Sequence, residues 1–415
     1  MLIVGAAVFA LGSLAAALAP NSDVLLDARI AQGAGAGLRA PSTAALLINA
    51  FPAEEHGRVL GVWGASASVA FVAGPLLGGL VTQSLGWPWV FAICVPVALA
   101  VIVLAFVGVP ESRDPAAGKR IDIAGIALAT AGLVALLLGL GRGEAIGVSG
   151  DWTLPLLAAS AVLLTLFVLV ERRRPDPVLD VGVFRNREFA VATGLEALAG
   201  GMLLGFFFAM TLYLQRVLNL EPLETALVLV PTSVVGIVLG APIGRLADRL
   251  GPRALIIAGM LVFGAALAWL AATVEPTLAA AALVPQVVVV GIGLSTMRSP
   301  ITAAGDRALS GAMTGSGSGV QQLASRLGGV VGVALLADVL GTVDPASGMD
   351  TALRAAFTDR LTTTLLVLAM VALAATVLAV VGLSARARRR AQPAEPMGAG
   401  AAGISGVSAA ELPSP

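Results

Sequence analysis

Twelve long apolar segments run through this chain, and they constrain its fold more than any other feature. A helix needs roughly 20 apolar residues to span a bilayer. The segments are close to that length or longer, with approximate limits 1–19, 24–50, 58–82, 88–109, 122–141, 152–170, 189–214, 223–243, 254–273, 277–297, 313–340 and 361–383. They are rich in Ala, Leu and Gly, whereas the strands of a transmembrane barrel alternate over about ten residues. The sequence therefore predicts an all-α polytopic membrane protein with 12 transmembrane helices.

Composition supports this prediction and excludes several function classes. The 415 residues are 58% hydrophobic and 12% charged, whereas soluble proteins are about 25% charged. The formal net charge is zero, so no nucleic-acid partner is predicted. Cys94 and His56 are the only residues of their types, which excludes an intrachain disulfide and any thiolate or multi-histidine metal site. The glycine-rich stretch 315–319 lacks the lysine of a P-loop, and we expect neither a cofactor nor an enzyme.

Basic residues are distributed unequally between alternate connections of the twelve segments. One set of connections contains 18 of the 25 Lys and Arg residues and the other set contains four. Three further arginines fall inside predicted spans: Arg29, Arg39 and Arg326. Because cytoplasmic loops carry the excess of Lys and Arg, we predict a multi-pass protein of the cytoplasmic (inner) membrane with a cytoplasmic C-terminus. This assignment places Arg298 and Arg307 in a cytoplasmic loop, and Arg354 and Arg360 in an outer one.

The third segment contains a stripe of small residues. Ser66, Ala70, Gly74 and Gly78 recur every four residues, which lets another helix approach one face closely, and Pro75 favours a bend. Generic tight packing is one interpretation. With its neighbours, the pattern also resembles the antiporter motif in the fifth helix of the major facilitator superfamily, with Ala70 where glycine is usual. The residues of this motif are Gly61, Ala70, Gly74, Pro75, Gly78 and Gly79.

The second segment contains Arg29, and an arginine at the middle of a spanning helix costs about 2.5–3.5 kcal/mol. The run Arg29-Ile-Ala-Gln32-Gly33 resembles the fourth helix of the same superfamily. The resemblance implies a role in proton coupling for Arg29 and Gln32, and a fixed cation influences when a neighbouring carboxylate releases its proton. Alternatively, Arg29 holds two helices together by pairing with a carboxylate or with helix-end carbonyls. For Arg39, substrate contact and snorkelling to the cytoplasmic surface both stay open.

A third match lies between the eighth and ninth segments, where residues 244–253 read GRLADRLGPR. This run resembles the Asp-Arg loop of the superfamily. The resemblance implies a cytoplasmic latch that forms in one transport state and breaks in the other, because a carboxylate there can bond the free amides of the next helix. The alternative is a tight basic turn. The latch residues are Gly244, Arg245, Asp248, Arg249 and Gly251.

Two charged residues in later segments complete the candidate site. Glu196 is the only acid well inside any predicted span, and it could carry a proton, attract a cationic substrate or pair with an arginine. Arg326 precedes the pair Gly328-Gly329, as an arginine often does in fourteen-helix members of the superfamily. The residues that we assign to proton coupling and a substrate cavity are Arg29, Gln32, Glu196 and Arg326.

The positions of the motifs imply a domain organisation. The fourth-helix and fifth-helix motifs lie in the second and third segments, so the chain resembles a fourteen-helix drug:proton antiporter from its third helix onward and lacks the first two. We predict an incomplete four-span bundle over 1–109 and a central linker with two extra helices over 110–188. A six-helix bundle over 189–383 and a disordered cytoplasmic tail over 384–415 follow.

The resemblance implies proton-coupled efflux of small amphipathic molecules, drugs or metabolites, by alternating access. The partners would be the lipid bilayer, protons and the small amphipathic substrate, and we expect a monomer. The alternative is a truncated, non-transporting membrane remnant, or a sensor on the same fold. Substitution of Arg29 and Glu196 separates the two, because only a transporter would lose proton-dependent efflux while keeping its expression.

Overall fold

The computed structural model describes residues 2–50, 56–108, 123–140, 150–173, 181–309, 314–341 and 350–383, and this part of the chain is helical, without strands. The first half contains α1 (Leu2–Ala17), α2 (Ser22–Ala50), α3 (His56–Leu85), α4 (Pro88–Ala92), α5 (Cys94–Gly108), α6 (Ile123–Leu140) and α7 (Thr153–Glu171). The second half contains α8 (Arg187–Leu212), α9 (Pro222–Leu250), α10 (Pro252–Thr273), α11 (Val284–Ala308), α12 (Thr314–Leu340) and α13 (Thr351–Gly382). A π-helical turn, η5 (Tyr213–Val217), extends α8. The predicted tail over 384–415 lies outside the described residues.

Eight helical stretches in the described residues are long and apolar enough to cross a membrane. They are Pro88–Gly108, Thr153–Glu171, Arg187–Val217, Pro222–Ala247, Pro252–Thr273, Ala280–Ala308, Gly317–Ala337 and Thr351–Gly382. The predicted all-α membrane fold is confirmed. The number 12 stays a prediction, because α1 and α6 are shorter than these stretches and α2 and α3 are not among them.

Helix α11 is displaced along the chain from its predicted limits. It begins at Val284 instead of near 277 and continues to Ala308. The prediction of a cytoplasmic loop around Arg298 and Arg307 is therefore wrong, since both lie in the helix. Two polar residues in the last turns of α11, Thr302 and Asp306, form hydrogen bonds with side chains of α8 and α12. These bonds satisfy the polar groups, so the helix continues although its sequence is no longer apolar.

Helix α13 begins ten residues before its predicted start, and the reason is local. The Asp350 side chain caps the helix by accepting from the Leu353 amide at 2.8 Å. Arg354 and Arg360 therefore lie in α13, and the prediction of an outer loop around them is wrong. The Arg360 guanidinium donates to the Leu340 carbonyl at the end of α12, at 3.2 Å.

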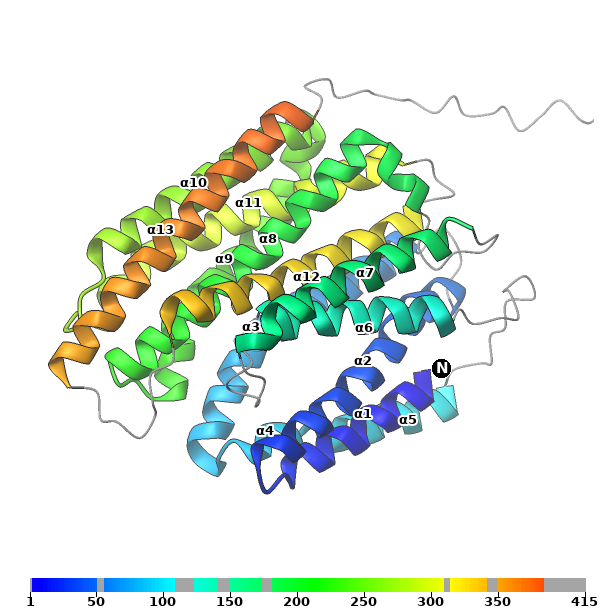
Figure 1. The fold of residues 1–415 in the computed structure, drawn as a ribbon, viewed down its shortest axis with the longest axis horizontal. Coiled ribbons are helices and arrows are strands. Elements are labelled where there is room, and N and C mark those ends of the chain that lie inside the picture. The colour runs from blue at the N-terminus through cyan, green and yellow to red at the C-terminus, as the bar shows by residue number, and fades with distance from the viewer. Residues whose placement is uncertain are drawn as a thin grey trace, which may run out of the picture.

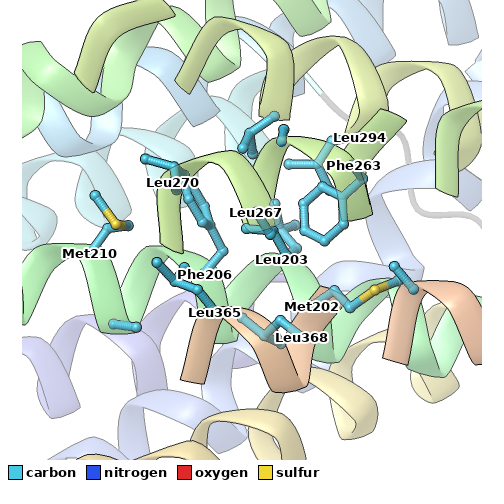
Figure 2. Packing of buried hydrophobic residues seen from close by; sticks show 14 of the residues in the cluster. Met202, Leu203, Phe206, Met210, Phe263, Leu267, Leu270, Leu294, Leu365 and Leu368 are labelled. Atoms are coloured by element: carbon cyan, nitrogen blue, oxygen red, sulfur yellow. The ribbon is translucent and has the colours of Figure 1, made fainter. Parts of the chain in front are cut away.

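A cluster of buried apolar side chains lies among α8–α13, whose arrangement is shown in Figure 1. Figure 2 shows this core from close by, with Phe206 of α8 and Phe263 of α10 fully buried among leucines and methionines. Lipid tails are as apolar as leucine, so such helices associate through close packing rather than through a hydrophobic driving force. Leu365 and Leu368 of α13 complete the packing against α8.

Helix α1 contacts α2, α4 and α5, and its contact with α2 is made through small residues. A Cβ atom built at Gly5 would lie 2.9 Å from the Arg39 amide nitrogen, and one at Gly12 would lie 2.5 Å from the Gln32 amide nitrogen. Only glycine permits such an approach between α1 and α2. Close backbone contacts of this kind occur in both halves of the chain, and the second half adds a core of large buried side chains.

Within the described residues, two helix pairs make the main contacts between the first half of the chain and the second (Figure 1). Helix α3 lies against α9, and α6 contacts α12 while also packing against α7. At the first contact, a Cβ atom built at Gly79 would lie 2.8 Å from the Pro222 carbonyl oxygen. The glycine therefore sets how closely α3 approaches the second half.

Candidate functional site

Arg29 belongs to a polar cluster where α1, α2 and α4 meet. Its guanidinium donates to Gln32 Oε1, and Gln32 Nε2 donates to Ser13 Oγ of α1 at 2.6 Å. The guanidinium carbon also lies 5.6 Å from the centroid of the Phe91 ring, within range of a cation–π interaction. Gln32 is 4% exposed, so its buried amide connects the arginine to the neighbouring helix. Within the described residues, the contacts of Arg29 are thus with an amide and an aromatic ring. The alternative in which Arg29 pairs with a carboxylate or with helix-end carbonyls has no such contact among them.

Arg39 also contacts an aromatic ring from a neighbouring helix. Its guanidinium carbon lies 4.8 Å from the centroid of the Phe9 ring on α1. Both arginines of α2 are therefore placed against phenylalanines, a feature that the sequence analysis did not predict. The interaction places each positive charge against the negative face of a ring.

Glu196 is 3% exposed and lies between α8, α11 and α12. Thr302 Oγ1 of α11 donates to Glu196 Oε1 at 2.6 Å, and the Ser325 side chain of α12 lies near the carboxylate. Arg298 of α11 lies within electrostatic range of Glu196. The buried acid is therefore held by the Thr302 hydroxyl of a neighbouring helix.

A second acid, Asp306, lies in the same region and was missed by the sequence analysis. It is half-buried on α11, and its Oδ1 accepts from Ser318 Oγ at 2.8 Å and from Gln321 Nε2 at 3.3 Å, both on α12. Because α11 continues to Ala308, Asp306 lies in its last turn rather than in a loop, whereas Glu196 lies well inside α8. The spacing Arg298, Thr302, Asp306 was an available signal, since residues four apart share a helix face.

Close helix contact brings α8 and α12 together at this cluster. A Cβ atom built at Gly200 would overlap the Ser325 carbonyl group, and one built at Gly328 would overlap the Ala197 carbonyl group. Glycine at these two positions therefore allows the backbones to touch next to Glu196 and at Ser325. The pair Gly328-Gly329, noted in the sequence for its neighbour Arg326, has this packing role.

Arg326 does not join the Glu196 cluster. Its side chain is exposed, whereas Gln321 and Ser325 on the same helix are buried. The adjacent residue Ser325 faces α8, so Arg326 is turned about 100° away from it on a helix of 3.6 residues per turn. The four predicted site residues thus occupy three places: Arg29 and Gln32 on α2, Glu196 between three helices, and Arg326 on an exposed face of α12.

The small-residue pattern of α3 packs differently from its prediction. Gly74 and Gly78 have open space where a side chain would be, and Ala70 is exposed. The close contact with α9 is made through Gly79, which lies beside the predicted stripe. Within the described residues, no helix packs closely against Gly74 or Gly78, and close packing along the whole stripe stays a prediction. Pro75 lies inside α3 as expected, and Gly61 lies in the same helix.

The predicted latch run is helical over most of its length. Residues 244–250 form the last turns of α9, and α10 begins at Pro252. The prediction of a loop is wrong, because the connection is one residue, Gly251, whose φ of 85° favours glycine. Arg253 Nη2 donates to the Val380 carbonyl of α13 at 2.6 Å, which fixes the start of α10. The side chain of Asp248 lies outside what the structure describes.

These observations define a class: a multi-pass helical membrane protein with charged and polar side chains buried between its helices. The chain matches the family model of the Major Facilitator Superfamily over residues 1–333, and it belongs to that superfamily. A POT family transporter in complex with 5-aminolevulinic acid has a similar fold, with a TM-score of 0.63 and 14% identity, covering 91% of this chain and 81% of that one.

Sequence relatives of this chain include resistance proteins. It is 33% identical over 339 residues to the multidrug resistance protein Stp of Mycobacterium tuberculosis, covering 81% of this chain and 63% of the relative. It is also 33% identical over 338 residues to the tetracenomycin C resistance and export protein of Streptomyces glaucescens, with 80% and 62% covered. The chain spans about three fifths of the length of these two relatives. The superfamily and these relatives are transporters, not enzymes.

Proposed function

We propose that this protein exports small amphipathic molecules, drugs or metabolites, across the cytoplasmic membrane in exchange for protons. The resistance and export functions in the names of its relatives support efflux. The observation that carries proton coupling is Glu196, a carboxylate buried between three helices and held by the Thr302 hydroxyl. Intramembrane acids of this kind are characteristic of proton pathways in transporters.

The proposal includes the fourteen-helix drug:proton antiporter type and alternating access. In this scheme the helices of 1–109 and of 189–383 form two bundles that rock against each other. The α3–α9 contact through Gly79 would be one of the surfaces that moves, and the α9–α10 joint at Gly251 would be the latch. A monomer in the lipid bilayer with a cytoplasmic C-terminus is part of the same proposal.

Arg29, Gln32 and Arg326 have distinct roles in this proposal. Arg29 would present a fixed positive charge, and Gln32 would hold the guanidinium in place through Ser13. Arg326, on its exposed face, would meet anionic or polar parts of the substrate or of the facing bundle. Glu196 would bind and release the coupled proton.

Efflux of ethidium, an amphipathic cation, from proteoliposomes with an imposed pH gradient tests the proposal. In the unmodified protein, we expect the pH gradient to accelerate efflux about 5–150-fold, which corresponds to a coupling free energy of about 1–3 kcal/mol. We expect Glu196→Gln to lose this acceleration. Glu275→Gln is the matched control, because Glu275 is exposed in the connection after α10. Equal acceleration in the Glu196 variant and the control would exclude Glu196 as the coupling acid.

The alternative function is a non-transporting membrane remnant or a sensor on the same fold. That alternative predicts no gradient-dependent efflux by the unmodified chain, and it predicts that Glu196→Gln changes thermal stability only. The same two measurements on one preparation therefore discriminate between a transporter and a scaffold.

A further inference from the structure

The carboxylate of Asp306 and the amide of Gln321 face each other between α11 and α12. Gln321 Nε2 donates to Asp306 Oδ1 at 3.3 Å, and Ser318 Oγ donates to the same oxygen at 2.8 Å. Gly305 precedes Asp306, and a Cβ atom there would overlap the Gln321 side chain. Because Gly305 has no side chain, the Gln321 amide has room to lie beside the Asp306 carboxylate.

The other end of the Gln321 amide lacks a partner. Gln321 is 1% exposed, and within the described residues its Oε1 atom is buried without a hydrogen-bond donor. A buried acceptor without a donor is unfavourable, and such groups in native proteins call for an explanation. The nitrogen of the same amide is directed at Asp306, so the unsatisfied oxygen belongs to the same local arrangement.

A proton on Asp306 would supply the missing donor. An ionised carboxylate only accepts hydrogen bonds, whereas a protonated carboxyl group has one O–H donor and keeps an acceptor. A primary amide has both N–H donors and a carbonyl acceptor. A neutral acid and a primary amide can therefore join through two hydrogen bonds, N–H to O and O–H to O, of which the structure contains the first.

We propose that Asp306 and Gln321 form a proton-binding site in which the proton binds Asp306 Oδ2 and is donated to Gln321 Oε1. No other bond is made or broken when the proton binds, and Gln321 Nε2 continues to donate to Asp306 Oδ1. On release of the proton, the carboxylate keeps the Ser318 and Gln321 donors. The role of this site rests on the proposed function: in a proton-coupled exporter, Asp306 would be a second proton-binding acid in addition to Glu196.

The charges around the site come from several helices. Residues on Asp306's own helix, on neighbouring helices and at the nearby start of α8 are Arg298, Arg307, Glu196, Arg187, Glu188, Arg245, Arg249, Arg253 and Arg326. Arg187 and Arg253 donate to carbonyl groups of α13, and the side chains of Arg245, Arg249 and Arg326 are exposed. Glu196 is within electrostatic range of both Asp306 and Arg298, and Arg307 is the next residue along α11.

Infrared difference spectroscopy of the chain in lipid nanodiscs, between alkaline and acidic buffer, tests the site without transport. Protonated carboxyl groups have a separate carbonyl stretching band, and labelling with isotope-enriched aspartate identifies the contribution of aspartates. We expect Asp306→Asn to remove one aspartate component and Asp359→Asn, at an exposed position of α13, to leave it. An unchanged component in Asp306→Asn would overturn the proposal.

A second variant tests the amide partner and stays informative if Asp306→Asn does not fold. Gln321→Met keeps the acid but removes the acceptor, so the frequency of the Asp306 band should shift while the band remains. The matched control is Gln322→Met, because Gln322 is the next residue on α12 and is exposed. An unshifted band in Gln321→Met would show that the amide is not the acceptor. Since ethidium efflux is measured separately, failure of transport and failure of this site are distinguishable.

Discussion

At the scale of single residues, Gln32 shows how a buried amide supports a charged neighbour. It accepts from Arg29 and donates to Ser13, which connects α2 to α1. We expect Gln32→Leu to destabilise the protein by about 1–3 kcal/mol, because both partners lose their hydrogen bond. The measurement is the thermal midpoint in detergent, against Gln322→Leu at an exposed position. Equal midpoints for the two variants would mean that the connection contributes nothing.

At the scale of elements, the contact of α8 with α12 depends on glycine at defined positions. A Cβ atom at Gly328 would overlap the Ala197 carbonyl group, whereas one at Gly319 of the same helix meets nothing within 4 Å. We expect Gly328→Ala to cost about 1–3 kcal/mol through forced separation of the helices. Gly319→Ala should stabilise slightly or have no effect, since alanine is the better helix former. Thermal midpoints that fall equally in both variants would contradict this account of the contact.

At the scale of the whole molecule, the two halves differ in how they are packed. Large buried side chains such as Phe206 and Phe263 fill the second half, whereas α1 and α2 meet through glycine and alanine. Regions with fewer buried contacts open at lower free energy. We therefore expect faster hydrogen exchange in α1 and α5 than in α8 and α10 in detergent micelles. Uniform exchange across these four helices would show that the halves are equally stable.

The sequence predicted most of the helices, because length and apolar character are local properties. At α11 it failed because the helix carries polar residues whose partners lie on other helices. Thr302 and Asp306 reduce the hydropathy of α11, and the prediction ended the helix before them. Their partners, Glu196 on α8 and Ser318 on α12, are separated from them by 106 and 12 residues. No local pattern contains that information.

Only part of the candidate site could be predicted from the sequence, because contacts between distant helices are not encoded locally. Arg29, Gln32 and Glu196 were noticed because polar residues are rare and costly in apolar segments. The sequence did not indicate which groups these residues contact. The phenylalanine partners of the α2 arginines and the exposed position of Arg326 depend on which face each helix presents to its neighbours.

The sequence by itself determined that this protein is a helical membrane protein, since apolar segments of this length must satisfy their backbone hydrogen bonds internally. It also contained the local signals for glycine contacts and for charges within helices. Only the tertiary structure decided which glycines touch a neighbouring helix, as Gly79 does and Gly78 does not. It also decided which groups each acid contacts: Thr302 donates to Glu196, and Ser318 and Gln321 donate to Asp306. The physical reason is that helix rotation and pairing are set by packing over the whole bundle, which no single segment specifies.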